Sequence, residues 1–450
     1  MLIFFMLLLL LFFLIGMSCF HPIPLPLFIL FSNIPGVTMA LSPISNLPFS
    51  SVWNAPSAAC LSQYGVDLDL GTFSIDQNQN QTFMGDDITI FYTDKLGVYP
   101  YYSRGKAVNG GVPQNASLDE HLRAVRNDIH KYIPDGDFQG LAVVDWESWR
   151  PVWERNWDTK QVYWEGSRVL VRSRHPDWKP AQVDALAHVE FEAAARKFME
   201  ETLKVGQKER PGGLWGFYGF PNCYNYYKNS NYTGQCPTVE SMRNDKLTWL
   251  WNVSSALYPD IYLSQELRSL DMEVSLYARH RILEAFRVAT PPRPIIPYAT
   301  IVYTYSFQFL SQEHLVYTVG ESAALGSAGV VLWGDHVFSK SKASCDAVKW
   351  YIDKTLGPYL VNVTSAAVLC SRARCSSRGR CARRDAESQV YLHLHPSHWK
   401  LTSERRMQGG RHYTVQGRLS TQEEILMMSR FECKCYPGWV GDKCATPRHG

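Results

Sequence analysis

Two carboxylates follow a predicted buried strand. Residues 140–147 read GLAVVDWE, so the run is apolar until Asp145 and Glu147. Because side chains on a strand alternate between its two faces, these two carboxylates point the same way. Like charges about 5 Å apart at an effective dielectric near 20 repel by about 3 kcal/mol. We therefore expect one of the two carboxyls to hold a proton, as a general acid must.

The spacing of the pair favours one type of glycoside hydrolysis. Retaining glycosidases usually hold an acid and a nucleophile on opposite sides of the scissile bond, which neighbours on one strand do not easily reach. The pair suits instead a scheme in which the acetamido group of an N-acetylhexosamine attacks its own anomeric carbon. Glu147 would protonate the leaving oxygen, and Asp145 would orient the acetamido nitrogen. The alternative is a structural role, in which the pair binds a loop amide or an arginine such as Arg150.

The elements that must position this pair alternate between strands and helices. Between residues 52 and 363, short apolar runs alternate with longer amphipathic stretches, a pattern typical of β/α units. The predicted strands span residues 52–55, 88–92, 140–147, 214–220, 261–263, 295–303 and 329–333. Helical periodicity covers residues 118–132, 180–205 and 274–289. We expect an α/β fold, a distorted TIM-like (β/α) barrel of about seven strands, with its site at the carboxyl ends of the strands.

The N-terminal segment and the cysteine count indicate a secreted or lysosomal protein. Residues 1–40 carry no charged side chain and begin with an apolar run, so we predict a signal peptide, cleaved after Ala40 or after Ser18. A retained signal anchor is the alternative. Loss of Cys19 leaves ten of the eleven cysteines, an even number that suits disulfide bonds. We expect no membrane anchor after signal removal. Glycosylation is predicted at Asn80, Asn115, Asn231, Asn252 and Asn362.

Six cysteines near the C-terminus resemble an epidermal-growth-factor-like (EGF-like) module. They begin at Cys370 and end at Cys444, with a long insertion over residues 382–432. The resemblance implies the pairs Cys370–Cys381, Cys375–Cys433 and Cys435–Cys444. A zinc site is the alternative, which a secreted chain does not favour. His393, His395 and His398 lie in the insertion without a carboxylate or cysteine at ligand spacing, so we predict no metal there.

Four cysteines remain for the barrel. Cys223 and Cys236 are expected to close a short loop, which leaves Cys60 to join Cys345. The chain is long enough for one large domain and one small one. We therefore divide it into the signal peptide over 1–40, the barrel over 41–365 and the EGF-like module over 366–450.

Several longer strings resemble the animal hyaluronidase family. They are GLAVVDWESWRP at 140–151, LWGFYGFPNCYNY at 214–226, GESAALGSAGVVLWGD at 320–335, GVPQN at 111–115, FYTDKLGVYP at 91–100 and NWDTK at 156–160. The resemblance runs from about Trp53 to Cys444. It implies a distorted barrel that hydrolyses the β-1,4 bonds between N-acetylglucosamine and glucuronate in hyaluronan. It also implies retention of configuration by the acetamido route, without a metal or other cofactor.

The resemblance extends to individual site residues. Asp145 and Glu147 match the family's catalytic pair, and Tyr218 matches the tyrosine beside the reacting acetamido group. The substrate-binding residues that it implies are Tyr92, Arg150, Tyr226, Tyr262, Arg281, Tyr298 and Trp333. Arg150 and Arg281 are candidate partners for hyaluronan carboxylates, through charge-assisted hydrogen bonds, although each could instead form a structural ion pair.

The overall charge narrows the choice of partners. The formal net charge is +3, from 45 Lys and Arg against 42 Asp and Glu, which does not favour nucleic acid. Chondroitin is an alternative substrate for the same chemistry. A hyaluronan-binding or adhesion protein with weak turnover is an alternative of another class. We expect a monomer.

Overall fold

The computed structural model describes residues 43–72, 75–405 and 411–448. The predicted signal peptide and Cys19 lie outside these residues. Among the described residues, no helix combines the length and apolar character that crossing a membrane requires.

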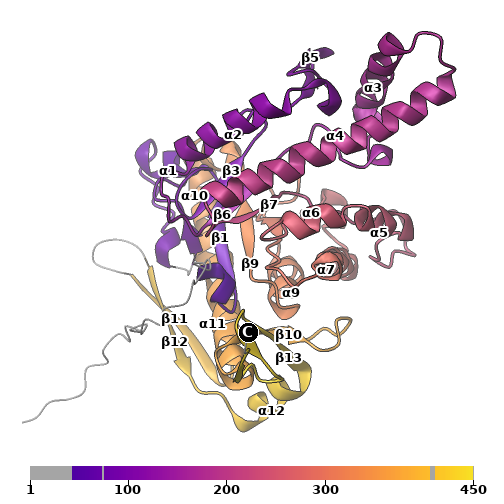
Figure 1. The fold of residues 1–450 in the computed structure, drawn as a ribbon. Helices are drawn as coiled ribbons and strands as arrows, with labels where there is room; N and C mark the ends of the chain where they lie inside the picture. Colours follow the sequence, from indigo (N-terminus) through magenta and orange to yellow (C-terminus); the bar gives the residue numbers. More distant parts are fainter. Residues whose placement is uncertain (1–42, 73–74, 406–410, 449–450) are drawn as a thin grey trace, which may run out of the picture. The chain divides into compact units, whose positions relative to one another are not determined.

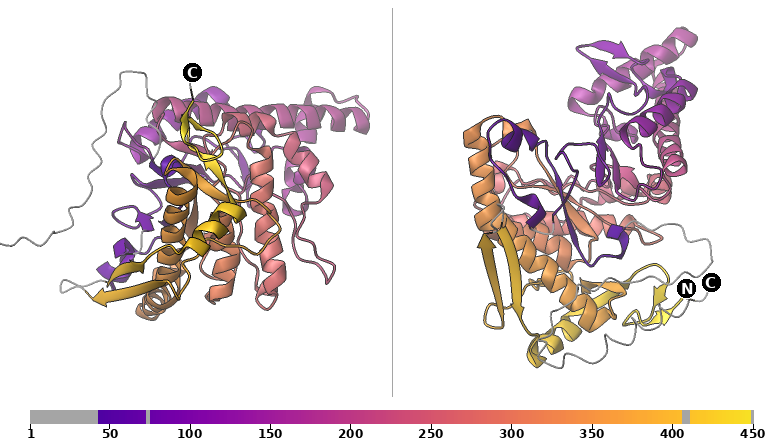
Figure 2. Two further views of the ribbon diagram at one scale, coloured as in Figure 1. Left: turned by 90° about the horizontal axis from the view of Figure 1, so that it is seen from below. Right: turned by 90° about the vertical axis from the view of Figure 1, so that its left-hand side faces the viewer.

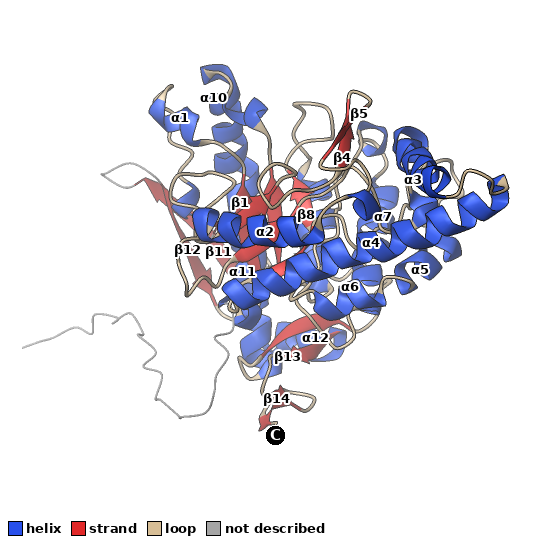
Figure 3. Ribbon diagram, turned by 45° about the horizontal axis from the view of Figure 1, so that its top comes forward, coloured by secondary structure: helices blue, strands red, loops and turns tan. Residues whose placement is uncertain are grey.

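Parallel strands form the centre of the fold in two sheets (Figure 3). The order in the first sheet is β2 (Ile75–Gln77), β1 (Ser50–Asn54), β9 (Gly329–Trp333) and β8 (Tyr298–Thr300). The order in the second is β3 (Ile88–Phe91), β6 (Leu141–Val144) and β7 (Leu214–Phe217). Single backbone bridges connect the sheets, from Tyr258 to Tyr218 and from Asp260 to Tyr298. Strands β1, β3, β6 and β7 are buried along their whole length, as expected where both faces of a parallel sheet are covered.

Six of the seven predicted strands are present, and the prediction of a strand at residues 261–263 is wrong. Residues 261–263 form no strand, and the chain pairs there only through isolated bridges at Leu257, Tyr258 and Asp260. Pro259 lies between these residues, and a proline cannot donate a ladder hydrogen bond. The sequence pattern also missed β2, which has only three residues.

Backbone pairing does not close the sheets into a barrel within the described residues, because no ladder joins β2 to β3. The side chain of Asn78 bridges this gap. Its Nδ2 donates to the carbonyl oxygen of Ile88 at 2.7 Å, and its Oδ1 accepts from the Ile88 N–H at 3.1 Å. The α/β class is confirmed. The two parallel sheets are connected by isolated bridges on one side and by the Asn78 side chain on the other.

The three predicted helices are present as α2 (Leu118–Tyr132), α4 (Pro180–Glu209) and α7 (Asp271–Val288). Ser117 caps α2, where its hydroxyl accepts from the N–H of Glu120. Helices α2 and α4 lie side by side (Figure 1). Further helices are α1 (Ala58–Ser62), α3 (Gln161–Arg174), α5 (Thr238–Asp245), α6 (Thr248–Val253), α8 (Gln312–Leu315), α9 (Glu321–Ala324), α10 (Lys342–Tyr351), α11 (Gly357–Cys375) and α12 (Thr421–Arg430).

The C-terminal segment packs on the same core as the preceding chain. The predicted boundary between residues 365 and 366 falls inside α11, whose buried side chains Leu360, Val363 and Ala367 share one apolar cluster with Phe431. The hairpin of β11 (Trp399–Arg405) and β12 (Arg411–Gly417) lies beside α11 (Figure 2). Other antiparallel pairs are β4 (Tyr101–Ser103) with β5 (Lys106–Val108), β10 (Gly379–Arg383) with β13 (Phe431–Cys435), and β14 (Trp439–Val440) with β15 (Thr446–Pro447). The division into a barrel and an EGF-like module remains a prediction.

Five disulfide bonds join the ten cysteines of the described residues. They are Cys60–Cys345, Cys223–Cys236, Cys370–Cys381, Cys375–Cys433 and Cys435–Cys444. The pairing is the one expected from the sequence and from the EGF-like resemblance. None of these ten cysteines is left as a thiolate ligand for zinc.

A buried ion network also connects the C-terminal segment to α7. Glu321 on α9 is fully buried and accepts from Arg279 Nε at 2.9 Å and from Arg383 Nη1 at 3.2 Å. Replacing Glu321 with Ala should therefore lower the free energy of unfolding by about 3–5 kcal/mol, because two buried arginines lose their carboxylate. Denaturant unfolding checks this value. The exposed Glu165→Gln variant is the control and should change stability by less than about 0.5 kcal/mol. A Glu321→Ala variant as stable as this control would contradict the expectation.

Candidate active site

The predicted carboxylate pair lies where β3, β6 and β7 end together. The Asp145 N–H donates to the carbonyl oxygen of Phe91 at 2.9 Å, one residue beyond β6. The Tyr218 N–H donates to the carbonyl oxygen of Val144 at 3.0 Å. These two bonds continue the parallel ladders, so Asp145 and Tyr218 leave neighbouring strands at the same level. A site at the carboxyl ends of the strands is where parallel α/β folds place their chemistry.

Asp145 and Glu147 differ in environment. Burial and the neighbouring charge of Glu147 raise the pKa of Asp145 to about 7, although Arg150 opposes the shift. The Asp145 Oδ1 atom is buried and has no hydrogen-bond partner among the described residues. The Glu147 side chain is 58% exposed and opens to the cleft. Below about pH 7 the pair therefore holds one proton, and the Asp145 Oδ1 atom is a buried oxygen whose partner is missing from the described residues.

Two cations hold the peptide that carries Glu147. Arg150 Nη2 lies 3.4 Å from Glu147 Oε1, so the structural alternative accounts for one contact of the pair. Lys160 Nζ donates to the carbonyl oxygen of Glu147 and, at 3.3 Å, to that of Ser148. Burial, with the charge of Arg150, lowers the pKa of Lys160 to about 8. Lys160, the lysine of the NWDTK string, thus has a structural role, because it holds the backbone of the segment that carries Glu147.

Aromatic rings surround the carboxylate pair. The Tyr218 ring centroid lies 6.0 Å from that of Tyr262 and 5.1 Å from that of Tyr298. The rings of Tyr262 and Trp333 are stacked with their centroids 6.0 Å apart, and Trp333 Nε1 donates to the Tyr92 hydroxyl at 3.0 Å. Burial and the charges of Asp260, Glu147 and Asp145 raise the pKa of Tyr218. Its phenol therefore stays neutral and can donate a hydrogen bond.

A cleft of about 1100 Å³ runs past these rings, a volume at the upper end of the range for small-ligand sites. The predicted site residues that line it are Asp145, Glu147, Tyr218, Tyr226, Tyr262 and Trp333. The other predicted residues, Tyr92, Arg150, Arg281 and Tyr298, are not among its lining residues. Tyr298 is fully buried, and Tyr92 supports Trp333. The described cleft lining therefore contains six of the ten predicted site residues.

Arg281 requires a correction, because the structure does not leave its side chain open to a substrate carboxylate. That side chain is only 1% exposed. Its Nη1 donates to Asp260 Oδ2 at 2.7 Å and its Nε donates to Asn225 Oδ1 at 2.9 Å. Asp260 lines the cleft, so Arg281 acts there by holding this carboxylate. Sequence reasoning missed Asp260, because the predicted strand began one residue after it.

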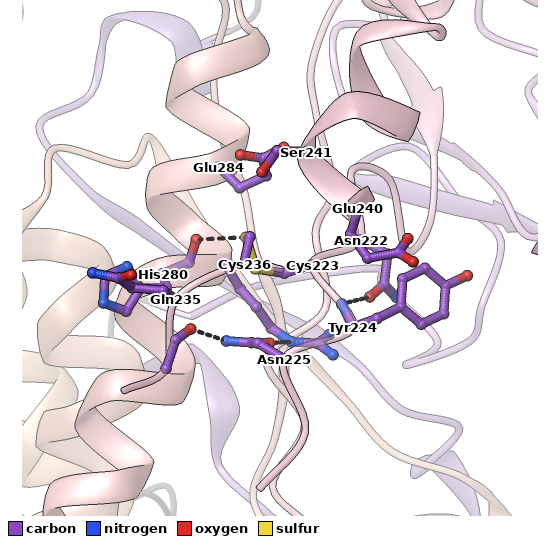
Figure 4. The surroundings of a disulfide bond; sticks show 12 residues. Asn222, Cys223, Tyr224, Asn225, Gln235, Cys236, Glu240, Ser241, His280 and Glu284 are labelled. Atoms are coloured by element: carbon purple, nitrogen blue, oxygen red, sulfur yellow. Dashed lines mark hydrogen bonds between the residues drawn. A yellow bond between two sulfur atoms is a disulfide. The ribbon is translucent and has the colours of Figure 1, made fainter. Parts of the chain in front are cut away.

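A disulfide fixes the loop that carries Tyr226 (Figure 4). Cys223 and Cys236 are bonded, and Asn225 Nδ2 donates across the loop to the carbonyl oxygen of Gly234 at 2.6 Å. The Cys236 Sγ atom lies 3.8 Å from the carbonyl oxygen of His280 on α7. The hydrogen bond from Arg281 Nε to Asn225 Oδ1 attaches the loop to α7, while Tyr226 remains exposed and lines the cleft.

The five predicted glycosylation sites differ in exposure. Asn80, Asn115, Asn231 and Asn252 are exposed. Asn362 is half-buried, and its Oδ1 accepts from the Leu394 N–H at 3.0 Å. Glycosylation at these positions remains a prediction.

Comparison with known proteins finds a matching family model, similar sequences and a similar crystal structure. A family model described as hyaluronidase matches residues 38–448. Hyaluronidase-1 of Sus scrofa is 48% identical over 428 residues, which cover 93% of this chain and 98% of that protein. Hyaluronidase-1 of Homo sapiens is 48% identical over 407 residues, 89% of this chain and 93% of that protein. The crystal structure of bee venom hyaluronidase in complex with a hyaluronic acid tetramer is similar with a TM-score of 0.64 and 33% identity, covering 69% of this chain and 98% of that one.

Proposed function

Because the chain belongs to the hyaluronidase family of glycoside hydrolases, we propose that it hydrolyses the β-1,4 bonds between N-acetylglucosamine and glucuronate in hyaluronan. The observation that carries the proposal is the Asp145 and Glu147 pair in an aromatic-lined cleft. The bee venom relative, solved with a hyaluronic acid tetramer, supports the same substrate class. The test is digestion of hyaluronan and of chondroitin by the purified protein, with sizing of the products. Progressive shortening of hyaluronan is expected, and intact hyaluronan would overturn the proposal.

The proposed mechanism assigns one role to each carboxyl. Glu147 opens to the cleft, so it protonates the leaving glycosidic oxygen and later takes a proton from the attacking water. Asp145 has an unpartnered oxygen, so it accepts from the acetamido N–H and turns the acetamido oxygen toward the anomeric carbon. The neutral phenol of Tyr218 donates to the same acetamido group. The cyclised intermediate then opens by attack of water from the other face, and the configuration is retained.

The pH profile tests the proton that the pair shares. The raised pKa of Asp145, about 7, means that the singly protonated pair persists below that pH and is lost as the pH rises through it. The kcat on hyaluronan should therefore fall by about tenfold per pH unit above pH 7. Measurement of kcat across this range checks the expectation. A kcat that stays level from about pH 6 to about pH 9 would remove the shared proton from the mechanism.

We also propose the finer organisation that the family resemblance implies. Residues 41–365 form a distorted barrel of about seven strands, in which Asn78 closes the gap between β2 and β3. Residues 366–450 form the EGF-like module, and its three disulfides support this assignment. The five disulfides and the exposed sequons support secretion or lysosomal delivery. The protein acts as a monomer, with the whole cleft formed by one chain.

A further inference from the structure

One wall of the cleft is a short hairpin with no role in the proposed reaction. Val302 pairs with Phe309, and the Tyr303 N–H donates to the carbonyl oxygen of Gln308 at 3.0 Å. The Thr304 N–H donates to the carbonyl oxygen of Leu263 at 2.8 Å, which attaches the hairpin to the segment after Tyr262. Residues 302–307 all line the cleft. The hairpin is therefore a fixed part of the wall.

Tyr305 at the tip of this hairpin is unusual in two ways. Its side chain is fully exposed, and its φ of +57° lies in the left-handed region, which a bulky side chain rarely adopts. The turn is held by its neighbours, since the Ser306 N–H and hydroxyl both bond the carbonyl oxygen of Tyr303, at 3.1 and 2.8 Å. Arg268 Nη1 donates to Gln308 Oε1 at 3.0 Å. Tyr305 thus lines the cleft with its backbone in a sparsely populated conformation, and such conformations cluster at ligand-binding and active sites.

Lys340 is the second unusual feature of this wall. The acidic residues that line the cleft are Asp145, Glu147, Asp260, Glu266 and Asp335, and Lys340 is the one basic residue among its described lining. Its ammonium group has no hydrogen-bond or ion-pair partner among the described residues. Its backbone is fixed, because the Tyr64 hydroxyl donates to the Lys340 carbonyl oxygen at 3.0 Å. Among the described lining residues, Lys340 therefore carries the positive charge that can attract a polyanion into this acidic cleft.

The hairpin and the Lys340 segment are neighbours. The Phe307 ring contacts the Phe338 ring with their centroids 6.2 Å apart, and both rings line the cleft. Lys340 follows Phe338 by two residues. This wall thus combines a flat apolar face with a cation, which is the chemistry that recognises an acidic sugar.

Resting on the proposed cleavage of hyaluronan, we propose that Tyr305 and Lys340 form an outer substrate subsite of the cleft. The Tyr305 ring stacks on the face of one pyranose, and Lys340 pairs with a glucuronate carboxylate. Neither residue touches the reacting bond, so the subsite contributes binding and selects chains long enough to reach it. Uniform binding of this kind changes KM and leaves kcat nearly unchanged.

Matched variants test the subsite. Tyr305→Asn keeps a residue that tolerates the left-handed backbone but removes the ring, and Tyr305→Phe keeps the ring. Tyr305→Asn should raise the KM for hyaluronan by roughly 5- to 10-fold with kcat within about 2-fold, and Tyr305→Phe should resemble the wild type. Trp350→Ala is the control, because Trp350 is a 61% exposed aromatic outside the cleft lining. Equal KM values for Tyr305→Asn and Trp350→Ala would overturn the role of the ring.

Lys340 is tested by its charge. Lys340→Gln should raise KM by about 2- to 5-fold at low ionic strength, less at high salt, and not at all on hyaluronan whose carboxylates have been reduced to alcohols. Lys340→Arg should retain the wild-type KM. Lys354→Gln removes an exposed lysine outside the cleft lining and is the control. A Lys340→Gln effect that persists on the carboxyl-reduced polymer would overturn the ion pair.

Calorimetric titration of a hyaluronan octasaccharide separates this inference from the proposed function. The titration is made in the Glu147→Gln background, with and without Tyr305→Asn and Lys340→Gln. Weaker binding in both double variants supports the subsite even if the wild type does not cleave hyaluronan. If the wild type cleaves hyaluronan but the two double variants bind the octasaccharide as tightly as Glu147→Gln alone, and the single variants keep the wild-type KM, the subsite is overturned and the proposed cleavage stands.

Discussion

Replacing Glu147 with Gln is expected to lower kcat on hyaluronan by about 10³-fold or more, because the amide keeps the shape of the side chain but has no transferable proton. The side chain is largely exposed and makes one contact of 3.4 Å with Arg150. The free energy of unfolding should therefore change by less than about 0.5 kcal/mol. Steady-state kinetics and denaturant unfolding of the purified variant check both values.

The matched control for this variant is Glu313→Gln, which makes the same chemical change at an exposed position outside the cleft lining. It should keep the wild-type kcat. Wild-type activity in Glu147→Gln would assign the acid role to another group, whereas loss of both activity and folding would point to a structural role for Glu147.

Asp145→Asn is expected to lower kcat by about 10²- to 10³-fold for a different reason. The buried Oδ1 of Asp145 has no partner, and its neighbour Glu147 is intact in this variant. We expect loss of the orientation of the acetamido group, so a thiazoline analogue of N-acetylglucosamine, which mimics the cyclised intermediate, should bind much more weakly than to the wild type. N-acetylglucosamine itself should lose less affinity. Equal weakening of the two ligands would contradict an acetamido-orienting role for Asp145.

Much of the fold followed from pattern alone. Residues 141–144 and 214–217 are continuous apolar runs, and these become strands buried on both faces. The period of residues 118–132 matched α2 at both ends, since Ser117 gives a clear start. The strand prediction for residues 261–263 was wrong, because the apolar residues there resemble a strand while Pro259 limits the pairing to single bridges. The Asn78 bridge was beyond prediction, because it depends on the spacing of β2 and β3.

The site was likewise predicted from the sequence only in part. The spacing of Asp145 and Glu147 sufficed to place both at the cleft, although the predicted strand over 140–147 ends at Val144 and both residues follow it. The burial of Arg281 could not be predicted, because it depends on how the segment that carries Asp260 folds back against α7. Lys160 acts through a backbone carbonyl, which no residue pattern records. Tyr305 gave no signal in the sequence, since its importance comes from its exposure and its backbone conformation.

The stereochemistry of the first product tests the central claim most directly. If the acetamido oxygen attacks the anomeric carbon and water then opens the ring from the other face, two inversions release the β-anomer. Nuclear magnetic resonance of early digestion products, recorded before mutarotation, should show the β-anomer of the new reducing N-acetylglucosamine. Initial release of the α-anomer would mean direct attack by water and would contradict the mechanism built on Asp145 and Glu147.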